Sequence, residues 1–421
     1  MRILITFLLF LMALNAPARG LQINGRLTSS LYTYEGQKNE ATTTGYLRAY
    51  QSLRLDLGDL MLSGLSFHTY LRGTSDLTEQ AETDPRLRVY STYLTWKKSR
   101  YQVHLGRQRI YAGVGYGSID GMRTHSTIAG FDLIFYAGML VPLDTSTGVN
   151  SWSAGNLWGA RLSTRRFFGT DLSLSFANRE REREAYERPG QYSGILVGPQ
   201  TIVQSLIGLD LNRHFAAGHN LYGRLDFDLK DESLRRAEVS ARYAVSSSLS
   251  AQGEWFRRAP SIFYNSIFSV FPSEAYQEMG ARFFYNVKPG LQLTAHFANV
   301  LYDGDSAQRL GLVAGIGDHY SIGYYRSMGY SRASDGLVGS IFYPFTRKLL
   351  LKGELDLSSY ERAENLDDRE ELVTGSLGLT YRPTRSLSLD LQVQGLRNPV
   401  YVSDTRLFLR GSWRFFKRGE R

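Results

Sequence analysis

The side chains best suited to chemistry are seven histidines, and their spacing predicts neither a catalytic triad nor a metal site. No two of them stand at i, i+2 or i, i+4, the spacings that let one strand or helix turn hold a metal. The chain has no Gly-x-Ser-x-Gly elbow and no cysteine, which excludes a thiol nucleophile, cysteine-ligated zinc and covalent haem. We therefore expect a protein that is not an enzyme and that holds no cofactor or metal. The histidines are His68, His104, His125, His214, His219, His296 and His319.

Charged residues instead alternate with apolar ones. From Leu221 to Leu229 every odd position is apolar or glycine, while the even positions include Arg224, Asp226 and Asp228. A period of two predicts a strand with one polar and one apolar face. The pattern recurs along the chain, and it predicts the following polar-face charges: Arg48, Arg54, Arg86, Arg88, Arg224, Asp226, Asp228, Arg236, Glu238, Arg242, Lys352, Glu354, Arg410 and Arg414.

These alternating segments predict a barrel in a membrane. They span about 9–13 residues, longer than most strands of soluble proteins and sufficient to cross a bilayer at a tilt. Amphipathic helices are excluded, because the charges would fall on every side of a helical wheel. Apolar residues make up 43% of the chain although its mean hydropathy is −0.27, as expected for lipid outside and water inside. The sequence predicts an all-β fold, a transmembrane antiparallel β-barrel of about 22 strands, within a range of 18–22.

The order of the segments predicts one domain and its location. Residues 1–18 have the basic start, apolar centre and small-residue end of a signal peptide, and 19–421 form a single barrel domain. The first predicted strand follows at once, so we expect no plug domain. Short turns alternate with long polar loops, one of which includes the charge run at 179–184. Short periplasmic turns and long external loops are typical of the bacterial outer membrane.

The segment 110–130 is unusual because it is rich in glycine and tyrosine. One interpretation is a connection that folds into the lumen and narrows it. The other is a plain external loop followed by a weak strand. For the first interpretation, the candidate constriction residues are Arg107, Gln108, Arg109, Tyr111, Tyr116, Asp120 and Arg123.

Two short motifs resemble those of known outer-membrane barrels. Leu105-Gly106-Arg107-Gln108 and Ile119-Asp120-Gly121-Met122-Arg123 together resemble the "GRQ … DG-(V/M)-R" pattern of alginate-export-like and related porin-like outer-membrane proteins. The resemblance implies the barrel class and does not imply alginate as a substrate. The last predicted strand, 405–416, resembles the C-terminal signal through which the barrel-assembly machinery recognises its clients.

Two functions fit a wide barrel without a plug. The first is a porin-like channel for passive passage of small hydrophilic solutes, with a preference for anions because the polar faces lean basic. The alternative is the sheath of a porin–cytochrome conduit, in which the barrel encloses a partner multihaem protein. The expected partners are outer-membrane lipid, the assembly machinery, and either further copies of the chain or a periplasmic or extracellular protein in the lumen. A net charge of +9 alone does not predict nucleic-acid binding.

Overall fold

The computed structural model describes most of the chain. It covers residues 21–39, 42–60, 62–78, 86–183, 185–187, 196–260, 275–302, 304–330, 332–361, 369–398 and 404–418. The predicted signal peptide, 1–18, lies outside these described residues. Within them, no helix is long and apolar enough to cross a membrane.

The described residues form twenty-four strands and one short 3-10 helix, η2 (Ala216–Gly218). The strands are β1 (Gln22–Asn39), β2 (Thr42–Gly58), β3 (Leu65–Asp76), β4 (Leu87–Lys98), β5 (Tyr101–Ala112), β6 (Gly115–Ile128), β7 (Phe131–Leu140), β8 (Gly155–Phe167), β9 (Thr170–Arg183), β10 (Tyr186–Glu187), β11 (Leu196–Val197), β12 (Gln200–His214), β13 (Asn220–Asp228), β14 (Ser233–Ala244), β15 (Leu249–Arg258), β16 (Tyr276–Lys288), β17 (Leu291–Leu301), β18 (Ser306–Ile316), β19 (Tyr320–Gly329), β20 (Ser334–Pro344), β21 (Leu349–Glu361), β22 (Arg369–Tyr381), β23 (Leu387–Arg397) and β24 (Asp404–Arg418).

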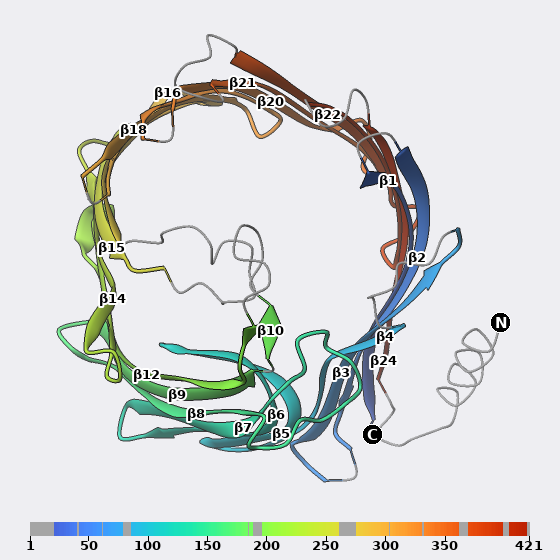
Figure 1. Cartoon of the computed structure of the whole chain (residues 1–421), viewed down its shortest axis with the longest axis vertical. Coiled ribbons are helices and arrows are strands. Elements are labelled where there is room, and N and C mark those ends of the chain that lie inside the picture. Colours follow the sequence, from blue (N-terminus) through green and yellow to red (C-terminus); the bar gives the residue numbers. More distant parts are fainter. Residues whose placement is uncertain are drawn as a thin grey trace.

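Twenty-two of these strands form one closed antiparallel barrel (Figure 1). Each strand pairs with the next, β9 pairs with β12, and β1 pairs with β24 to close the ring. The short β10 and β11 pair only with each other. Closure matters because it leaves no edge strand with unpaired backbone groups, which hydrocarbon would not tolerate. The predicted antiparallel barrel of 22 strands is confirmed.

The outer face of the barrel is apolar. Strand register aligns Leu225, Leu209, Leu174, Leu162 and Leu133 in one row across five strands. Four of these leucines have exposed side chains. Exposed leucines in such rows are favourable only against lipid. Exposed aromatic residues stand on the same face near the short-turn ends of the strands: Trp96, Tyr101, Tyr243, Tyr285, Tyr320, Tyr381 and Trp413.

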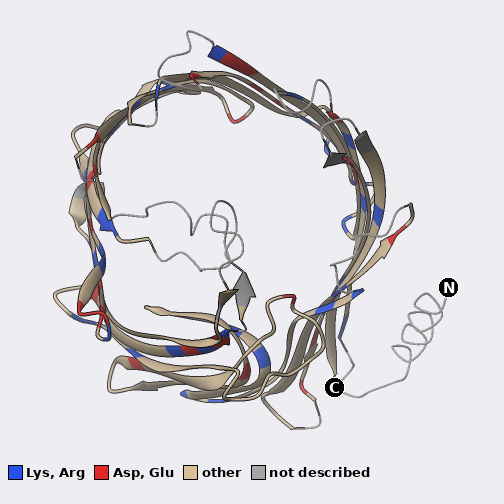
Figure 2. Cartoon of the chain, viewed as in Figure 1, with Lys and Arg blue, Asp and Glu red and all other residues tan. Residues whose placement is uncertain are grey.

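This outer face places the protein in a membrane. An apolar band bordered by aromatic side chains is the pattern by which bacterial outer-membrane barrels match the hydrocarbon layer and its interface. The chain is therefore an outer-membrane barrel. Its strands carry charged residues on every side of the ring (Figure 2).

The end of the β5–β6 hairpin leaves the wall and folds into the lumen (Figure 1). The backbone N–H of Val114, at the turn, donates to Ser175 Oγ on β9 at 3.1 Å. Side chains of the hairpin and of the lumen face of β7–β9 form one buried apolar cluster: Ile110, Ala112, Val114, Ile119, Ile134, Tyr136, Leu140, Leu157 and Ala177. Of the two interpretations of 110–130, the structure has the first: the segment includes a hairpin with a tight turn, and its tip is a second layer on the lumen wall.

Two glycines allow this bend. Gly106 has a φ of 123°, a backbone conformation that residues with a side chain rarely adopt. A Cβ at Gly106 would also lie 2.4 Å from Thr92 O. A Cβ on Gly121 would lie 2.2 Å from Ala137 O and 2.4 Å from Gly138 Cα. Both glycines belong to the motif that resembles alginate-export-like proteins. The motif therefore encodes the place where the sheet folds back on itself.

We expect Gly121→Val to destabilise the barrel by about 1–3 kcal/mol or more, because the new side chain meets backbone atoms that cannot move aside. Unfolding of the barrel in detergent or lipid by urea measures the change. The matched control is Gly253→Val, since a Cβ there meets nothing within 4 Å. Equal stability of the two variants would contradict the packing at the bend.

The charge run at 179–184 was predicted to lie in an external loop, and for 179–183 this prediction is wrong. Strand β9 continues to Arg183, and Arg179 to Arg183 pair with β12 residues 200–204. Alternating arginine and glutamate have the period of a strand, and the partner strand supplies the ladder. Glu184 lies outside the described residues.

Candidate functional site

The lumen wall formed by β24, β1, β2 and β3 carries a row of arginines, which we call the arginine row. Strand register places Arg26 directly opposite Arg54 on one side and opposite Arg414 on the other. Arg72 lies on β3 opposite Ser52, which is two residues from Arg54 along β2. Sequence reasoning predicted Arg54 and Arg414 as lumen charges and missed Arg26 and Arg72.

No ion pair neutralises the arginine row within the part of the chain that the structure describes. Arg26 donates to Ser412 Oγ at 3.1 Å, and Arg54, Arg72 and Arg414 form no ion pair with a described carboxylate. The Nε atoms of Arg26 and Arg72 are buried, and no described residue forms a hydrogen bond with either. Like charges directly opposite each other on neighbouring strands destabilise a sheet. The row therefore concentrates positive charge at a cost to stability.

Tyrosines hold parts of this basic wall in place. The guanidinium carbon of Arg72 lies 5.2 Å from the ring centre of Tyr50 and 5.4 Å from that of Tyr90. Tyr90 in turn stacks on Tyr70 at 4.8 Å between ring centres. Cation–π contacts restrain the guanidinium without neutralising it. Arginines and aromatic residues together line a recess of about 650 Å³ on this wall.

Most other predicted lumen charges are paired. Arg48 donates to Asp76 at 2.7 Å, and Arg224 donates to both carboxylate oxygens of Asp226 at 2.9 and 3.0 Å. Arg410 donates to Asp390 at 3.2 Å. The pairs Arg236–Glu238 and Arg235–Asp228 complete this group. The charges of such pairs cancel locally, whereas those of the arginine row are not paired with a described carboxylate.

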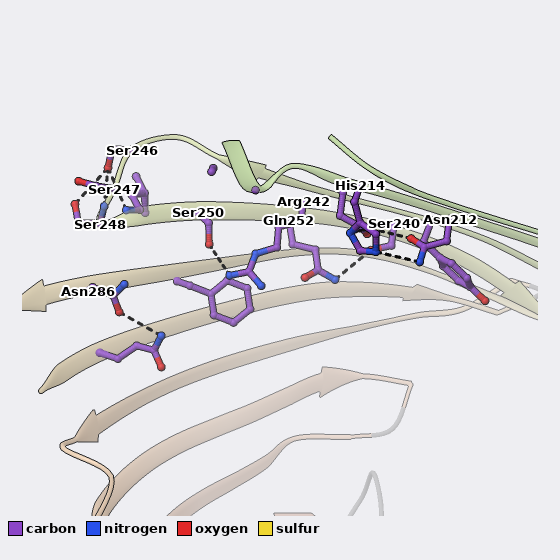
Figure 3. Close-up of a pocket in the computed structure, with 17 residues that line it drawn as sticks. Asn212, His214, Ser240, Arg242, Ser246, Ser247, Ser248, Ser250, Gln252 and Asn286 are labelled. Carbon is purple, nitrogen blue, oxygen red and sulfur yellow. Dashed lines mark hydrogen bonds between the residues drawn. The ribbon is translucent and has the colours of Figure 1, made fainter. Parts of the chain in front are cut away.

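The remaining predicted lumen charges lie as follows. Arg86 is exposed in the connection before β4, and Arg88 is opposite Arg72. Lys352 and Glu354 are exposed on β21, with the Lys352 ammonium 5.9 Å from the Phe342 ring centre. Arg242 donates to Ser250 Oγ at 3.0 Å beside a polar recess of about 720 Å³ (Figure 3).

Three of the predicted constriction residues position the hairpin: Arg107 and Gln108, which are buried, and Asp120, which is half-buried. Arg107 donates to both carboxylate oxygens of Asp120 at 2.8 Å, and also to the carbonyl oxygens of Ser146 and Gly148, at 2.5 Å each. Gln108 Nε2 donates to Gly121 O at 3.2 Å. These contacts stabilise the bend of the hairpin and attach to it the external loop between β7 and β8, which includes Ser146 and Gly148.

The exposed constriction candidates face the lumen. Tyr111 and Tyr116 are 57% and 60% exposed and overhang a recess of about 850 Å³. Arg109 Nη1 donates to Tyr111 Oη at 3.0 Å, so it lies on the same side of the hairpin. Arg123 lies on the part of β6 that remains in the barrel wall, opposite His104 on β5 and Tyr136 on β7. The structure thus brings Arg109, Tyr111 and Tyr116 together and separates them from Arg123.

The external loop at the bend carries one titratable group with a shifted pKa. The backbone N–H of Ser146 donates to Asp144 Oδ1 at 2.9 Å and holds the pKa of the carboxyl below its usual range. Asp144 and Ser146 belong to the same loop that receives Arg107. The carboxylate form therefore supports the loop conformation that braces the hairpin.

Comparisons with solved structures identify the architecture. No protein-family model and no curated protein match the chain. A mutant of the ferric enterobactin receptor PfeA from Pseudomonas aeruginosa is similar with a TM-score of 0.57 and 11% identity, covering 93% of this chain and 80% of that one. The siderophore receptor PirA from the same organism gives 0.56, 12%, 95% and 81%. OpdQ, also from Pseudomonas aeruginosa, gives 0.42, 9%, 94% and 98%. At these identities, the likeness to PfeA and PirA shows the fold alone.

Proposed function

We propose that the barrel is a porin-like channel for passive passage of small hydrophilic solutes, with a preference for anions. The observation that carries the proposal is the arginine row, Arg414–Arg26–Arg54, whose charges no described carboxylate pairs. Unpaired charge on the wall of a water-filled pore raises the local concentration of the opposite ion. A wall whose charges all cancelled would give no such preference.

The hairpin supplies the second requirement of a channel, a restricted passage. Its tip occupies part of the lumen, where Tyr111 and Tyr116 overhang the wall. The buried contact of Ile110 and Ile119 with the wall fixes the tip, so the narrowing does not depend on a mobile loop. The hairpin on β7–β9 and the basic wall on β24 and β1–β3 border the same lumen, so solutes in transit meet both. The passage therefore selects by size and by charge.

Purification in mild detergent followed by reconstitution tests the channel function. We expect the barrel alone to conduct ions in a planar bilayer and to let small sugars and organic anions into liposomes in a swelling assay. A barrel that conducts no ions and that co-purifies with a multihaem protein would contradict the channel and support the sheath function. The swelling assay with solutes of increasing size then measures the restriction that the hairpin imposes.

A further inference from the structure

Three side chains that could bind a metal meet on the lumen wall away from the arginine row. They are Glu254 on β15, Glu278 on β16 and His296 on β17, three strands that are neighbours in the barrel. Their ligand atoms all lie within 4.8 Å of one another. Because each residue comes from a different strand, sequence spacing could not reveal the cluster.

A glycine makes room for this convergence. On β16 the lumen-facing position between Glu278 and Arg282 is Gly280, which pairs with Glu254. A Cβ at Gly280 would lie 3.1 Å from Glu254 Cγ and from Glu254 Oε1. The carboxylate of Glu254 thus lies over the gap that the glycine leaves, and it points toward Glu278 and His296.

Among the residues that the structure describes, the imidazole Nε2 of His296 has no hydrogen-bond partner. This atom is buried, and it lies 3.7 Å from Glu254 Oε1, beyond hydrogen-bond distance. A buried polar atom without a partner costs free energy. A metal ion between the imidazole nitrogen and the carboxylate oxygen would remove that cost, because such an ion binds both atoms at about 2.0–2.2 Å.

Two arginines compensate the carboxylates without a metal and can move aside. Arg309 Nη1 donates to Glu278 Oε2 at 3.1 Å, and Arg282 Nη2 lies 3.7 Å from Glu254 Oε1. Their side chains are 48% and 37% exposed, so either guanidinium can turn into lumen water when a metal ion takes its place beside the carboxylate. Glu278 itself is only 6% exposed, which keeps its carboxylate in place for a ligand.

The geometry points to a binding site for a divalent transition-metal ion at Glu254, Glu278 and His296. Two carboxylates and one imidazole suit zinc and similar ions, whereas calcium and magnesium prefer oxygen ligands alone. Three protein ligands leave a position for water from the lumen. The ion would join β15, β16 and β17 through their side chains, a link additional to the backbone ladder. This site goes beyond the proposed channel function and does not depend on it.

Zinc titration of the folded barrel by isothermal calorimetry, in detergent and in a buffer that does not chelate metals, tests the site. We expect saturable binding of one zinc ion per barrel. His296→Gln and Glu254→Gln should each weaken binding about tenfold or more, since each removes a direct ligand. The matched control is His68→Gln, because His68 Nδ1 lies 2.6 Å from a single carboxylate, Asp56, and has no second one.

Folding of each variant is verified by the difference in gel mobility between unheated and heated samples. Glu254→Gln keeps the size of the side chain, so it separates loss of a ligand from loss of packing. Two results would overturn the proposal: wild-type barrel that binds no zinc at micromolar concentration, or His296→Gln that binds zinc as tightly as the wild type. A loss of binding in His68→Gln as large as in His296→Gln would also overturn it, because zinc would then bind elsewhere.

Discussion

Replacement of Arg26, Arg54 and Arg414 by glutamine is expected to abolish the preference of the channel for anions. The three guanidinium groups are aligned across β24, β1 and β2, and no described carboxylate pairs with them. Removing them takes away the uncompensated positive charge of that wall, so the chloride-to-potassium permeability ratio should fall by about threefold or more. Reversal potentials in a potassium chloride gradient measure the ratio.

The matched control removes the same charge outside the lumen wall. Arg347, Lys348 and Arg385 are exposed in the turns before β21 and β23, and their replacement by glutamine should leave the ratio close to that of the wild type. A ratio that falls equally in both triple variants would show that net charge, and not the arginine row, sets the preference. The lumen variant should also be no less stable than the wild type, since it relieves repulsion between opposed like charges.

Ile119→Asp is expected to free the inward hairpin and to widen the passage. Ile119 is fully buried between the hairpin and the wall, so the substitution places a carboxylate in an apolar cluster without a partner. The cost, about 2–5 kcal/mol, falls on the contact between hairpin and wall rather than on the barrel ladder. We expect higher single-channel conductance, with more current noise, and faster entry of larger solutes in the swelling assay.

Ile119→Val is the control at the same position. Valine keeps the cluster apolar and removes only one methylene group, so the hairpin stays docked on the wall. Its conductance should stay near that of the wild type. If Ile119→Asp left both conductance and the solute size limit unchanged while the barrel remained folded, the hairpin would not be the restriction.

Local alternation was enough to predict the barrel. In β13, Leu225 and Phe227 face outward while Arg224 and Asp226 face the lumen, as the period of two requires. The same alternation places Arg26 on β1 and Arg72 on β3 in the lumen. Neither residue was among the predicted lumen charges, although the period of two in the sequence was sufficient to predict both.

The inward hairpin could not be predicted from alternation. Ile110, Ala112 and Ile119 occupy lumen-facing register positions that elsewhere carry polar residues, and only the fold shows that they pack on β7–β9. The contact that fixes the tip joins Val114 to Ser175, sixty-one residues apart. The metal cluster is equally non-local, because Glu254, Glu278 and His296 come together through strand register and the missing side chain of Gly280.

The reversal potential of the wild-type barrel in a planar bilayer with a potassium chloride gradient shows whether the barrel is an open channel that selects by charge. Such selectivity would come from the lumen arginines that no described carboxylate pairs. We expect a stable conductance with a reversal potential whose sign shows that chloride is more permeant than potassium. A reversal potential that favours potassium, or a purified barrel that carries no current, would contradict this expectation.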